Sequence, residues 1–195
     1  METWKRSQNM LVVSLEEGAF VGRLEDFQFD LQTHQIYGWR LKKTGMFSRV
    51  GGLPSQKLVR IGREVALLES EQCVEWSTTK STATVGRAWA STYNGVAVMS
   101  RRGVAMGAVS DFIVDVAGNE VTGLILRCSE GSRLLPLTEN VQTGPDVIII
   151  RREDLVVMLP DEEEEETWWQ RLRDVLLGRK ADEKLALSDD AHEEE

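Results

Sequence analysis

Cysteine, histidine and long apolar segments are scarce in this chain of 195 residues. Its two cysteines, Cys73 and Cys128, match no CxxC or other metal-ligand spacing. No apolar run approaches the ~20 residues that a membrane-spanning helix needs. Residues 1–10 also lack the apolar core and the cleavage site of a secretory signal. We therefore expect a cytoplasmic protein with free thiols and no transmembrane segment.

The sequence also lacks recognisable catalytic machinery. Neither of the two histidines, His34 and His192, neighbours a cysteine or serine in a way that indicates a nucleophile. The glycine-containing stretches GRLED and GAVSD have neither the lysine nor the strand-to-helix context of a phosphate-binding loop. We expect no enzyme, and no catalytic, cofactor-binding or metal-binding residues.

Charge is distributed unevenly along the chain, whose formal net charge is −9. Residues 1–95 contribute +2, from 12 Lys+Arg and 10 Asp+Glu. Residues 96–160 contribute −2, from 6 and 8, and residues 161–195 contribute −9, from 5 and 14. A neutral body is therefore followed by an acidic tail, and the two parts suit different partners.

An internal repeat is the most informative feature of the sequence. Residues 18–42 align without a gap to residues 103–127 at an offset of 85, and a second block follows at an offset of 82. We interpret the chain as a tandem duplication. The identical pairs are Gly18/Gly103, Gly22/Gly107, Asp26/Asp111, Phe27/Phe112, Asp30/Asp115, Gly38/Gly123, Leu41/Leu126, Leu53/Leu135, Pro54/Pro136, Val59/Val141, Gly62/Gly144 and Val65/Val147.

Each copy has the pattern of short β-strands. In the stretch RLEDFQFD, alternation places Leu24 and Asp26 on one face and Phe27 and Phe29 on the other. The Gly-Asn pair at 118–119 suits a hairpin turn. Glycine inside a strand typically marks a bulge or a sharp bend. Short strands with glycines at fixed places predict a small, strongly bent β-barrel in each copy.

The repeated order of residues resembles a known family. Each copy reads Gly-x-x-x-Gly-x-[LV]-x-Asp-Phe-x-x-Asp, a hairpin, [IV]-x-Gly-x-x-Leu, then Leu-Pro and Gly-x-[ED]-Val. This order is similar to the PRC-barrel domain of the photosynthetic reaction-centre H subunit and of the bacterial ribosome-maturation factor. The resemblance implies a β-barrel that serves as an adaptor or assembly surface, without family-wide catalytic residues. The chain departs from both relatives because it lacks the H subunit's transmembrane helix and the ribosome factor's separate N-terminal domain.

We therefore predict an all-β fold of two tandem small PRC-type β-barrels with a C-terminal amphipathic helix and an acidic disordered tail. The predicted parts are repeat 1 over 8–76, a Ser- and Thr-rich linker over 77–92, repeat 2 over 93–160, and the acidic tail over 161–195. Trp89 and Tyr93, in or next to the linker, are expected to pack on one barrel.

The tail contains a predicted amphipathic helix over about residues 165–179. Its apolar stripe follows a run of six acids, and Gly178 is a plausible C-cap. The stripe could pack on the chain's own barrels, or it could dock on a partner through its Trp pair. Membrane binding is disfavoured because the acids would be repelled by anionic headgroups. The stripe consists of Trp168, Trp169, Leu172, Val175 and Leu176.

The repeated acids Asp26, Asp30, Asp111 and Asp115 are the strongest chemical candidates. Paired carboxylates can hold a metal or act as acid and base. Along a strand, however, residues i and i+4 lie roughly 13 Å apart, which is too far to share one ion. We favour a structural role, in which the acids hydrogen-bond backbone N–H groups at turns and Gly22 and Gly107 allow the bends.

Residues 31–63 contain no Asp or Glu and carry seven cations. With Trp39 and Phe47 nearby, this stretch could bind RNA or another anionic partner, with residues 38–63 as its core. A solvated barrel face is the competing interpretation. A further hypothesis is that the acidic tail lies over this region and masks it. The cations are Arg40, Lys42, Lys43, Arg49, Lys57, Arg60 and Arg63.

These patterns favour a non-catalytic adaptor or scaffold that binds protein partners through its barrels and its tail helix. The alternatives are an accessory protein for ribosome or RNA maturation, and an assembly factor for a photosynthetic or other membrane complex. We expect protein partners, with RNA or the ribosome as the second option and no DNA, and we leave a homodimer open. The fold alone does not name the partner, because one fold serves many functions.

Overall fold

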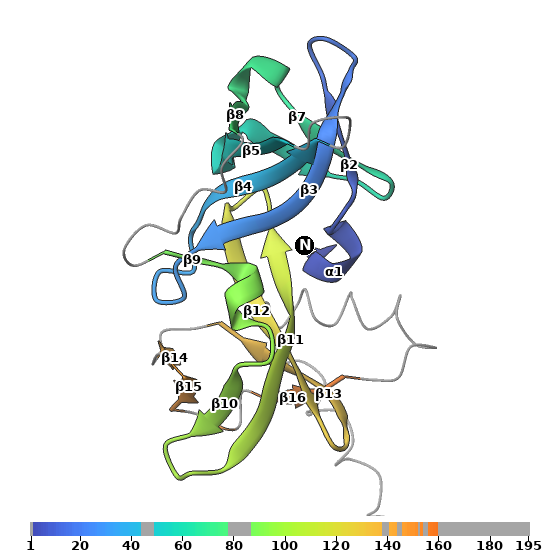
Figure 1. The fold of residues 1–195 in the computed structure, drawn as a ribbon. Helices are drawn as coiled ribbons and strands as arrows, with labels where there is room; N and C mark the ends of the chain where they lie inside the picture. The colour runs from blue at the N-terminus through green and yellow to red at the C-terminus, as the bar shows by residue number, and fades with distance from the viewer. Residues whose placement is uncertain are drawn as a thin grey trace, which may run out of the picture. The chain divides into compact units, whose positions relative to one another are not determined.

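A computed structural model describes residues 2–43, 49–77, 87–137, 141–143, 146–151, 153 and 156–159. Residues 1–159 form one compact unit, and residues 160–195 form a second unit outside the described part. The described part is mostly β-structure in two sheets (Figure 1), which confirms the predicted all-β class. The predicted tail helix lies outside the described residues.

The first sheet is formed by the N-terminal half of the chain. Its strands follow the order β6-β7-β2-β3-β4-β5-β8, and β9 pairs with β3 outside this path. Two short 3-10 helices, η1 (Ser55–Lys57) and η2 (Glu71–Cys73), connect its later strands. The strands are β2 (Leu11–Ser14), β3 (Phe20–Phe29), β4 (Ile36–Lys43), β5 (Arg49–Pro54), β6 (Leu58–Ile61), β7 (Val65–Leu68), β8 (Glu75–Ser77) and β9 (Ala88–Trp89).

The second sheet is formed mainly by the C-terminal half. Its strands follow the order β14-β15-β10-β11-β12-β13-β16, and β1 (Glu2–Thr3) pairs with β11 outside this path. The strands are β10 (Ala97–Ser100), β11 (Ala105–Asp115), β12 (Glu120–Cys128), β13 (Gly131–Pro136), β14 (Val141–Thr143), β15 (Val147–Ile150) and β16 (Val157–Met158).

The two sheets have equivalent strand orders and pairings. β2 pairs in parallel with β7, with Leu11 opposite Val65, and β10 pairs in parallel with β15, with Ala97 opposite Val147. The remaining main neighbours in each sheet are antiparallel. Neither sheet closes into a barrel among the described residues, so the predicted tandem barrels are not confirmed.

Bulges change which residues of β3 face the core. The register of β3 with β4 shifts between Leu24 and Asp26, and β11 shifts against β12 at the equivalent position. Because a bulge inserts one extra residue, each side chain that follows it points to the opposite face of the sheet from the one that strict alternation would give. Leu24 is therefore buried together with Phe27 and Phe29. The prediction that Leu24 faces away from the two phenylalanines is wrong, because strict alternation ignores the bulge.

Glycine is required where β3 and β11 pass close to a neighbouring strand. A Cβ at Gly22 would lie 2.9 Å from the carbonyl oxygen of Lys42, and a Cβ at Gly107 would lie 2.8 Å from that of Arg127. Gly107 also has a φ of +138°, which L-residues rarely adopt. The repeated glycines therefore allow the first part of each long strand to approach its partner.

The two sheets share one hydrophobic core, in which aromatic residues from both halves of the chain meet. Phe112 of β11 lies with its ring centroid 5.6 Å from Phe27 and 5.5 Å from Phe29 of β3. Trp4 stacks edge-on against Phe27 at 4.9 Å, and Trp39 lies 5.6 Å from Phe27. Burial of this aromatic cluster stabilises the association of the two halves, because it removes apolar surface of both halves from water.

Each sheet is extended by a short arm that leads into the other half of the chain. β1 and the single-turn helix α1 (Trp4–Ser7) precede β2, yet β1 pairs with β11 of the second sheet. β9 and the 3-10 helix η3 (Ala90–Tyr93) precede β10, yet β9 pairs with β3 of the first sheet. Tyr93 packs 5.3 Å from Phe29, and Trp89 contacts Arg40, as expected for two aromatics on one sheet. The arms are thus exchanged reciprocally.

The β3–β4 and β11–β12 turns are joined by a matching pair of hydrogen bonds. The amide of Ile36 donates to the carbonyl of Asn119 at 2.7 Å, and the amide of Val121 donates to the carbonyl of His34 at 2.9 Å. His34 and Asn119 occupy equivalent turn positions and have φ values of 62° and 55°. Both residue types are enriched in this left-handed region. The turn backbone therefore adds a second connection between the halves.

Candidate functional site

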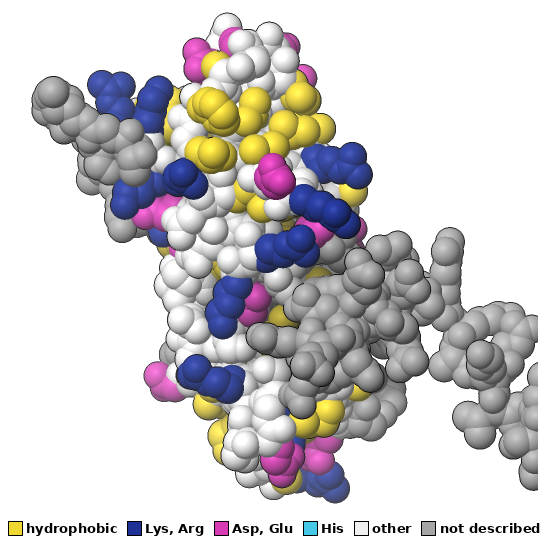
Figure 2. Space-filling model, turned by 90° about the vertical axis from the view of Figure 1, so that its right-hand side faces the viewer, with side chains coloured by type: hydrophobic (Ala, Val, Ile, Leu, Met, Phe, Trp, Pro, Cys, Tyr) yellow, Lys and Arg dark blue, Asp and Glu magenta, His cyan; other side chains and the backbone are white. Residues whose placement is uncertain are grey.

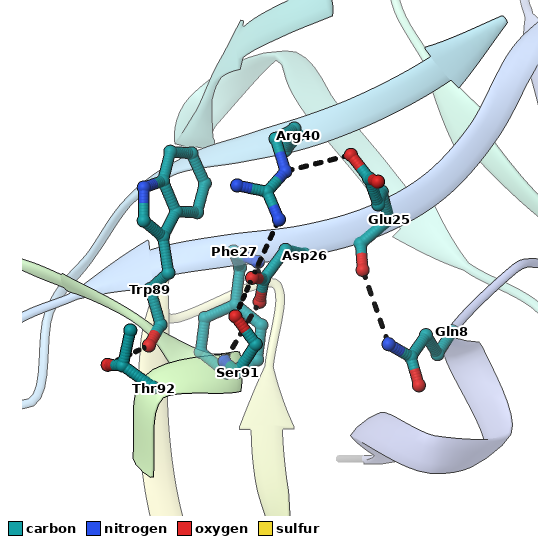
Figure 3. A network of polar contacts seen from close by, with 8 residues as sticks. All are labelled: Gln8, Glu25, Asp26, Phe27, Arg40, Trp89, Ser91 and Thr92. Atoms are coloured by element: carbon teal, nitrogen blue, oxygen red, sulfur yellow. Dashed lines mark hydrogen bonds and ion pairs between the residues drawn. The ribbon is translucent and has the colours of Figure 1, made fainter. Parts of the chain in front are cut away.

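Asp26 lies at the centre of a buried polar network between the first sheet and the arm of the second half (Figure 3). Its side chain is 1% exposed. Oδ1 accepts hydrogen bonds from the amides of Phe27 at 2.9 Å and Ser91 at 3.3 Å. Oδ2 accepts from the Ser91 hydroxyl at 2.6 Å and from Nη2 of Arg40 at 3.1 Å. The carboxylate therefore holds the first turn of η3 against β3.

Arg40 completes this network from β4. Its Nε donates to Oε2 of Glu25 at 2.8 Å, and the ring of Trp89 lies 4.3 Å from its guanidinium carbon (Figure 3). The side chain of Arg40 is only 12% exposed. A guanidinium between two carboxylates and an aromatic face has its charge balanced. Arg40 therefore acts as part of the contact between the halves.

Asp111 makes the equivalent contact in the second sheet, but without an ion pair to an arginine of β12. Its Oδ1 accepts from the amides of Phe112 at 2.8 Å and Lys5 at 2.9 Å, so it holds the first turn of α1. Ile125 lies opposite Asp111, where Arg40 lies opposite Asp26. Burial raises the pKa of Asp111 above its ordinary value, and the two amide bonds oppose that rise.

The other two repeated acids lie at the ends of β3 and β11. Oδ1 of Asp30 accepts from the amides of Gln32 at 2.7 Å and Thr33 at 3.2 Å. The carboxylate of Asp115 lies beside Gly118 in the second hairpin. Within the described part, no group of three or more His, Cys, Asp or Glu side chains is placed to hold a metal ion. Three of the four acids thus bind backbone N–H groups.

The seven cations of the predicted anion-binding stretch do not form one group. Arg40 is turned into the buried network, and Lys57 forms an ion pair with Glu69. The remaining cations are exposed and belong to two regions whose strands, β5 and β6, lie towards opposite ends of the strand order. These regions contain Lys42, Lys43 and Arg49 on β4 and β5, and Arg60 and Arg63 on or just after β6.

The predicted partner-binding residues of the tail fall outside the described part of the chain. This applies to Trp168, Trp169, Leu172, Val175 and Leu176.

An exposed apolar patch on the outer face of the first sheet was missed by the sequence analysis. Residues directly opposite on neighbouring strands share a face. Val13 lies opposite both Phe20 and Leu67, and Leu11 lies opposite Val65. Phe20 is 71% exposed and the other four are partly exposed. We call these five residues, Leu11, Val13, Phe20, Val65 and Leu67, the β2–β7 patch.

Cations border the β2–β7 patch. Arg23 lies opposite Leu11 across β2 and β3, and Arg60 lies opposite Leu67 across β6 and β7. Figure 2 shows hydrophobic side chains gathered over the part of the molecule that holds β2, β3 and β7, with Lys and Arg beside them. A signal for the patch exists in the sequence, since β2 and β7 read Leu-Val-Val and Val-Ala-Leu-Leu without alternation. Such runs are typical of strands covered on both faces.

The second sheet has a weaker version of this patch. Met99 occupies the position equivalent to Val13, with Ala105 opposite it in place of Phe20 and Ile149 in place of Leu67. Ala97 lies opposite Ala108 in the second sheet, whereas at the equivalent positions of the first sheet Leu11 lies opposite Arg23. The large exposed aromatic and its neighbouring arginine are therefore features of the first sheet.

No helix in the described residues is long and apolar enough to cross a membrane. A comparison with curated proteins finds no match to the chain. The family model of the PRC-barrel domain matches residues 90–156, a range that begins with η3 and includes β10 to β15. PRC-barrel domains are protein-interaction modules and are generally not catalytic. That residues 8–76 form a second copy stays a prediction. The match at residues 90–156 confirms the family that the repeated motif predicted.

Proposed function

We propose that this chain is a non-catalytic, cytoplasmic adaptor that binds a protein partner through the β2–β7 patch. In this proposal residues 8–76 and 93–160 are tandem copies of one domain, and the acidic tail regulates or extends the binding surface. The PRC-barrel match supports an interaction module. The free thiols of Cys73 and Cys128 are compatible with a reducing compartment.

The exposure of Phe20 is the observation that carries the proposal. A phenylalanine that is 71% exposed loses the stabilisation that burial of its ring would provide. Single exposed apolar residues are common, but a contiguous group with polar neighbours typically marks an interaction site. Phe20 lies in such a group, beside Val13 and Leu67. Aromatic and arginine side chains are also the residues that contribute most at protein interfaces.

Affinity purification from the native organism tests the proposal. The full chain and its Phe20→Ser variant are compared, with Val104→Ser as the matched control. Val104 is 48% exposed and directly precedes β11, as Ala19 directly precedes β3. The Val104→Ser substitution therefore removes exposed apolar surface from the second sheet instead of the first. We expect a specific protein that the wild type and Val104→Ser retain and that Phe20→Ser loses. Equal recovery with all three chains would contradict the assignment of the patch.

A second candidate function, in RNA or ribosome maturation, is favoured by one observation. Lys43 lies directly opposite Arg49 on neighbouring strands, and both side chains are exposed. Two cations on one face of a sheet can contact a phosphate backbone. Binding of an rRNA fragment should then weaken steeply with added salt and should be reduced in Lys43→Glu/Arg49→Glu. A flat salt response would remove this candidate.

A further inference from the structure

We infer that the protein partner of the β2–β7 patch is a second copy of this chain. In this dimer the two first sheets pack face to face, with their strands running in opposite directions. The inference rests on the proposed function, because it names the partner of the same surface. Its support comes from the rows of side chains in the patch, from the opposite charges at its two ends, and from the difference between the two sheets.

The β2–β7 patch and its neighbouring arginine form two rows of side chains that run across three strands. Successive side chains on one face of a strand lie about 6.6 Å apart, so the two rows make a narrow strip. Five of the six positions are apolar, and Arg23 is the sixth. From β7 through β2 to β3, the first row holds Val65, Leu11 and Arg23, and the second row holds Leu67, Val13 and Phe20.

A second copy fits this strip when it is turned end over end. A half-turn about an axis that crosses the strands between the rows places the first row of one copy over the second row of the other. Each strand then lies over its own counterpart, which runs in the opposite direction. Arg23 of one copy covers Phe20 of the other, and Leu11 covers Val13. An arginine over an aromatic ring is favourable, and its methylene groups also cover apolar surface.

The end of the patch at the β2–β3 turn is acidic. Glu16 and Glu17 lie in this turn, and Glu69 directly follows β7. Lys57 forms an exposed ion pair with Glu69, and the acids remain in excess. Figure 2 shows Asp and Glu side chains at this end of the molecule, above the gathered hydrophobic side chains.

The opposite end of the patch carries cations. Arg23 lies beside Leu11, and its Nη1 donates to the carbonyl of Asn9 at 2.7 Å, which holds the guanidinium at this end. Arg63 is exposed in the turn before β7. Glu64 follows Arg63 and offsets one of the two charges, so the cations remain in excess. Figure 2 shows Lys and Arg side chains below and beside the hydrophobic group.

The charges at the two ends select the antiparallel arrangement. The half-turn places the acidic end of each copy over the cationic end of the other, so opposite charges meet twice. Copies packed with their strands in the same direction would bring acids against acids and cations against cations. Complementary charge at the border of an apolar contact favours one orientation over the other. Because both copies present the same surface, the contact also closes at two.

The second sheet lacks the side chains that this contact uses. Ala105 stands at the position equivalent to Phe20, and Ala108 stands at the position equivalent to Arg23. Alanine buries much less apolar surface than a phenylalanine ring and carries no charge. The contact therefore joins the first sheet of one copy to the first sheet of the other.

The width of the contact sets the expected strength of the dimer. β6, β7, β2 and β3 are neighbours in the sheet, and strands about 4.8 Å apart make this face about 15 Å wide. Interfaces of such limited extent lie at the lower end of the range for stable complexes. The dimer should therefore dissociate on dilution, and its dissociation constant is a measurable quantity.

Analytical ultracentrifugation of the full chain tests the inference. Wild type, Phe20→Ser and the control Val104→Ser are compared from about 0.1 to about 100 µM. We expect wild type and Val104→Ser to form dimers with the same dissociation constant. Phe20→Ser should raise this constant at least about tenfold, because it removes the aromatic contact of both copies. Added salt should weaken the wild-type dimer, since it screens the charges at the ends.

Two charge-reversal variants test the orientation. Arg23→Glu/Arg63→Glu makes both ends of the patch acidic, and Glu16→Lys/Glu69→Lys removes the acidic end. Each variant alone should dimerise at least about tenfold more weakly than the wild type, because like charges then face each other. An equal mixture of the two should form a heterodimer again, with one variant carrying a fluorescent label. Circular dichroism of each variant verifies that the two sheets are still folded.

The opposite results overturn the inference. A wild-type chain that stays monomeric at about 100 µM, or a Phe20→Ser dimer as strong as the wild-type dimer, would show that a second copy does not occupy the patch. Charge-reversal variants that dimerise as well as the wild type would show that the copies do not pack antiparallel. The proposed adaptor function would still stand if Phe20→Ser loses a different protein in affinity purification. If Phe20→Ser changed neither measurement, the proposed function would be overturned too.

Discussion

Phe27 and Phe112 pack edge to face across the boundary between the two sheets, with ring centroids 5.6 Å apart and planes at 86°. They are the same residue of the repeated motif, offset by 85 positions. Each lies next to the aspartate that binds the arm of the other half. The motif therefore forms a single central contact, in which each copy meets its own counterpart.

Phe112→Ala should destabilise the whole described unit. Removing a buried phenylalanine ring typically costs about 3–5 kcal/mol, because apolar contacts are lost and a cavity remains. Since Phe112 also contacts Phe27 and Phe29, both sheets should unfold in one transition. Chemical denaturation followed by tryptophan fluorescence and by circular dichroism checks this. Two separate transitions in the wild type would contradict a shared core, and Phe112→Leu serves as the milder control.

Cleavage of the chain between the halves should leave them associated. A protease site placed within residues 78–86 separates β8 from β9, yet β1 would still pair with β11 and β9 with β3. We expect the two fragments to co-elute in size-exclusion chromatography after complete cleavage, and to separate in denaturant. Separation of the fragments in native buffer would show that the exchanged arms and the shared aromatic core are too weak to hold them.

Asp26→Asn and Asp111→Asn should differ in how much they destabilise the protein, although the two residues occupy equivalent positions in the repeat. Asp26→Asn breaks a buried ion pair with Arg40, a change that typically costs about 3 kcal/mol or more. Asn at 111 can still accept hydrogen bonds from the amides of Phe112 and Lys5. It also removes a carboxyl whose pKa is raised by burial, so we expect a change within about 1 kcal/mol. Urea denaturation of both variants at pH 7 checks the order.

The raised pKa of Asp111 predicts that the stability of the protein depends on pH. A raised folded-state pKa means that the folded protein holds the Asp111 proton more tightly than the unfolded chain. The stability that this provides is present below the unfolded value and is lost as the pH rises through the folded pKa. Between the unfolded-state and the folded-state pKa, the free energy of unfolding of Asp111→Asn should therefore rise relative to that of the wild type. Above the folded-state pKa the difference between the two proteins should stay constant. A constant difference from pH 3 to pH 7 would be inconsistent with this assignment.

Glu17 should contribute to stability only when it is ionised. Its carboxylate accepts hydrogen bonds from the hydroxyls of Ser14 and Ser70, which lower its pKa from 4.5 to about 2. A lowered folded-state pKa gives a contribution that is present above 4.5 and disappears as the pH falls through about 2. Glu17→Gln should be less stable than the wild type at pH 6, and the difference in stability between the two proteins should disappear towards pH 2. Thermal unfolding across this range measures the difference, and Glu16→Gln is the neighbouring control.

Much of the local structure follows from residue types at short range. Period-2 patterns and short apolar runs located the strands, because side chains alternate across a half-buried strand and a strand covered on both faces is apolar throughout. The repeat placed Gly22 and Gly107 at equivalent close approaches of two strands. The alternation of β3 was predicted wrongly at Leu24, because no residue type requires a bulge at that place. The family was identified from the same short motif, since its glycines and aspartates serve the backbone.

Contacts between distant segments could not be derived in this way. Nothing in the motif indicates that Asp26 binds Ser91 or that Asp111 binds Lys5, because the arms could as well have packed on their own sheets. Arg40 looked like a free cation in a basic stretch until Glu25 and Asp26 were found against it. The β2–β7 patch was hidden for a related reason, since a run of apolar residues does not reveal whether its second face is covered.

Residue order thus accounts for where the strands, turns and repeated glycines lie, because these depend on backbone sterics and on neighbours a few positions away. Folding in three dimensions accounts for the exchanged arms, the shared core around Phe27 and Phe112, and the exposure of Phe20. Those features depend on which distant surfaces exclude water from each other, and burial is a property of the assembled chain.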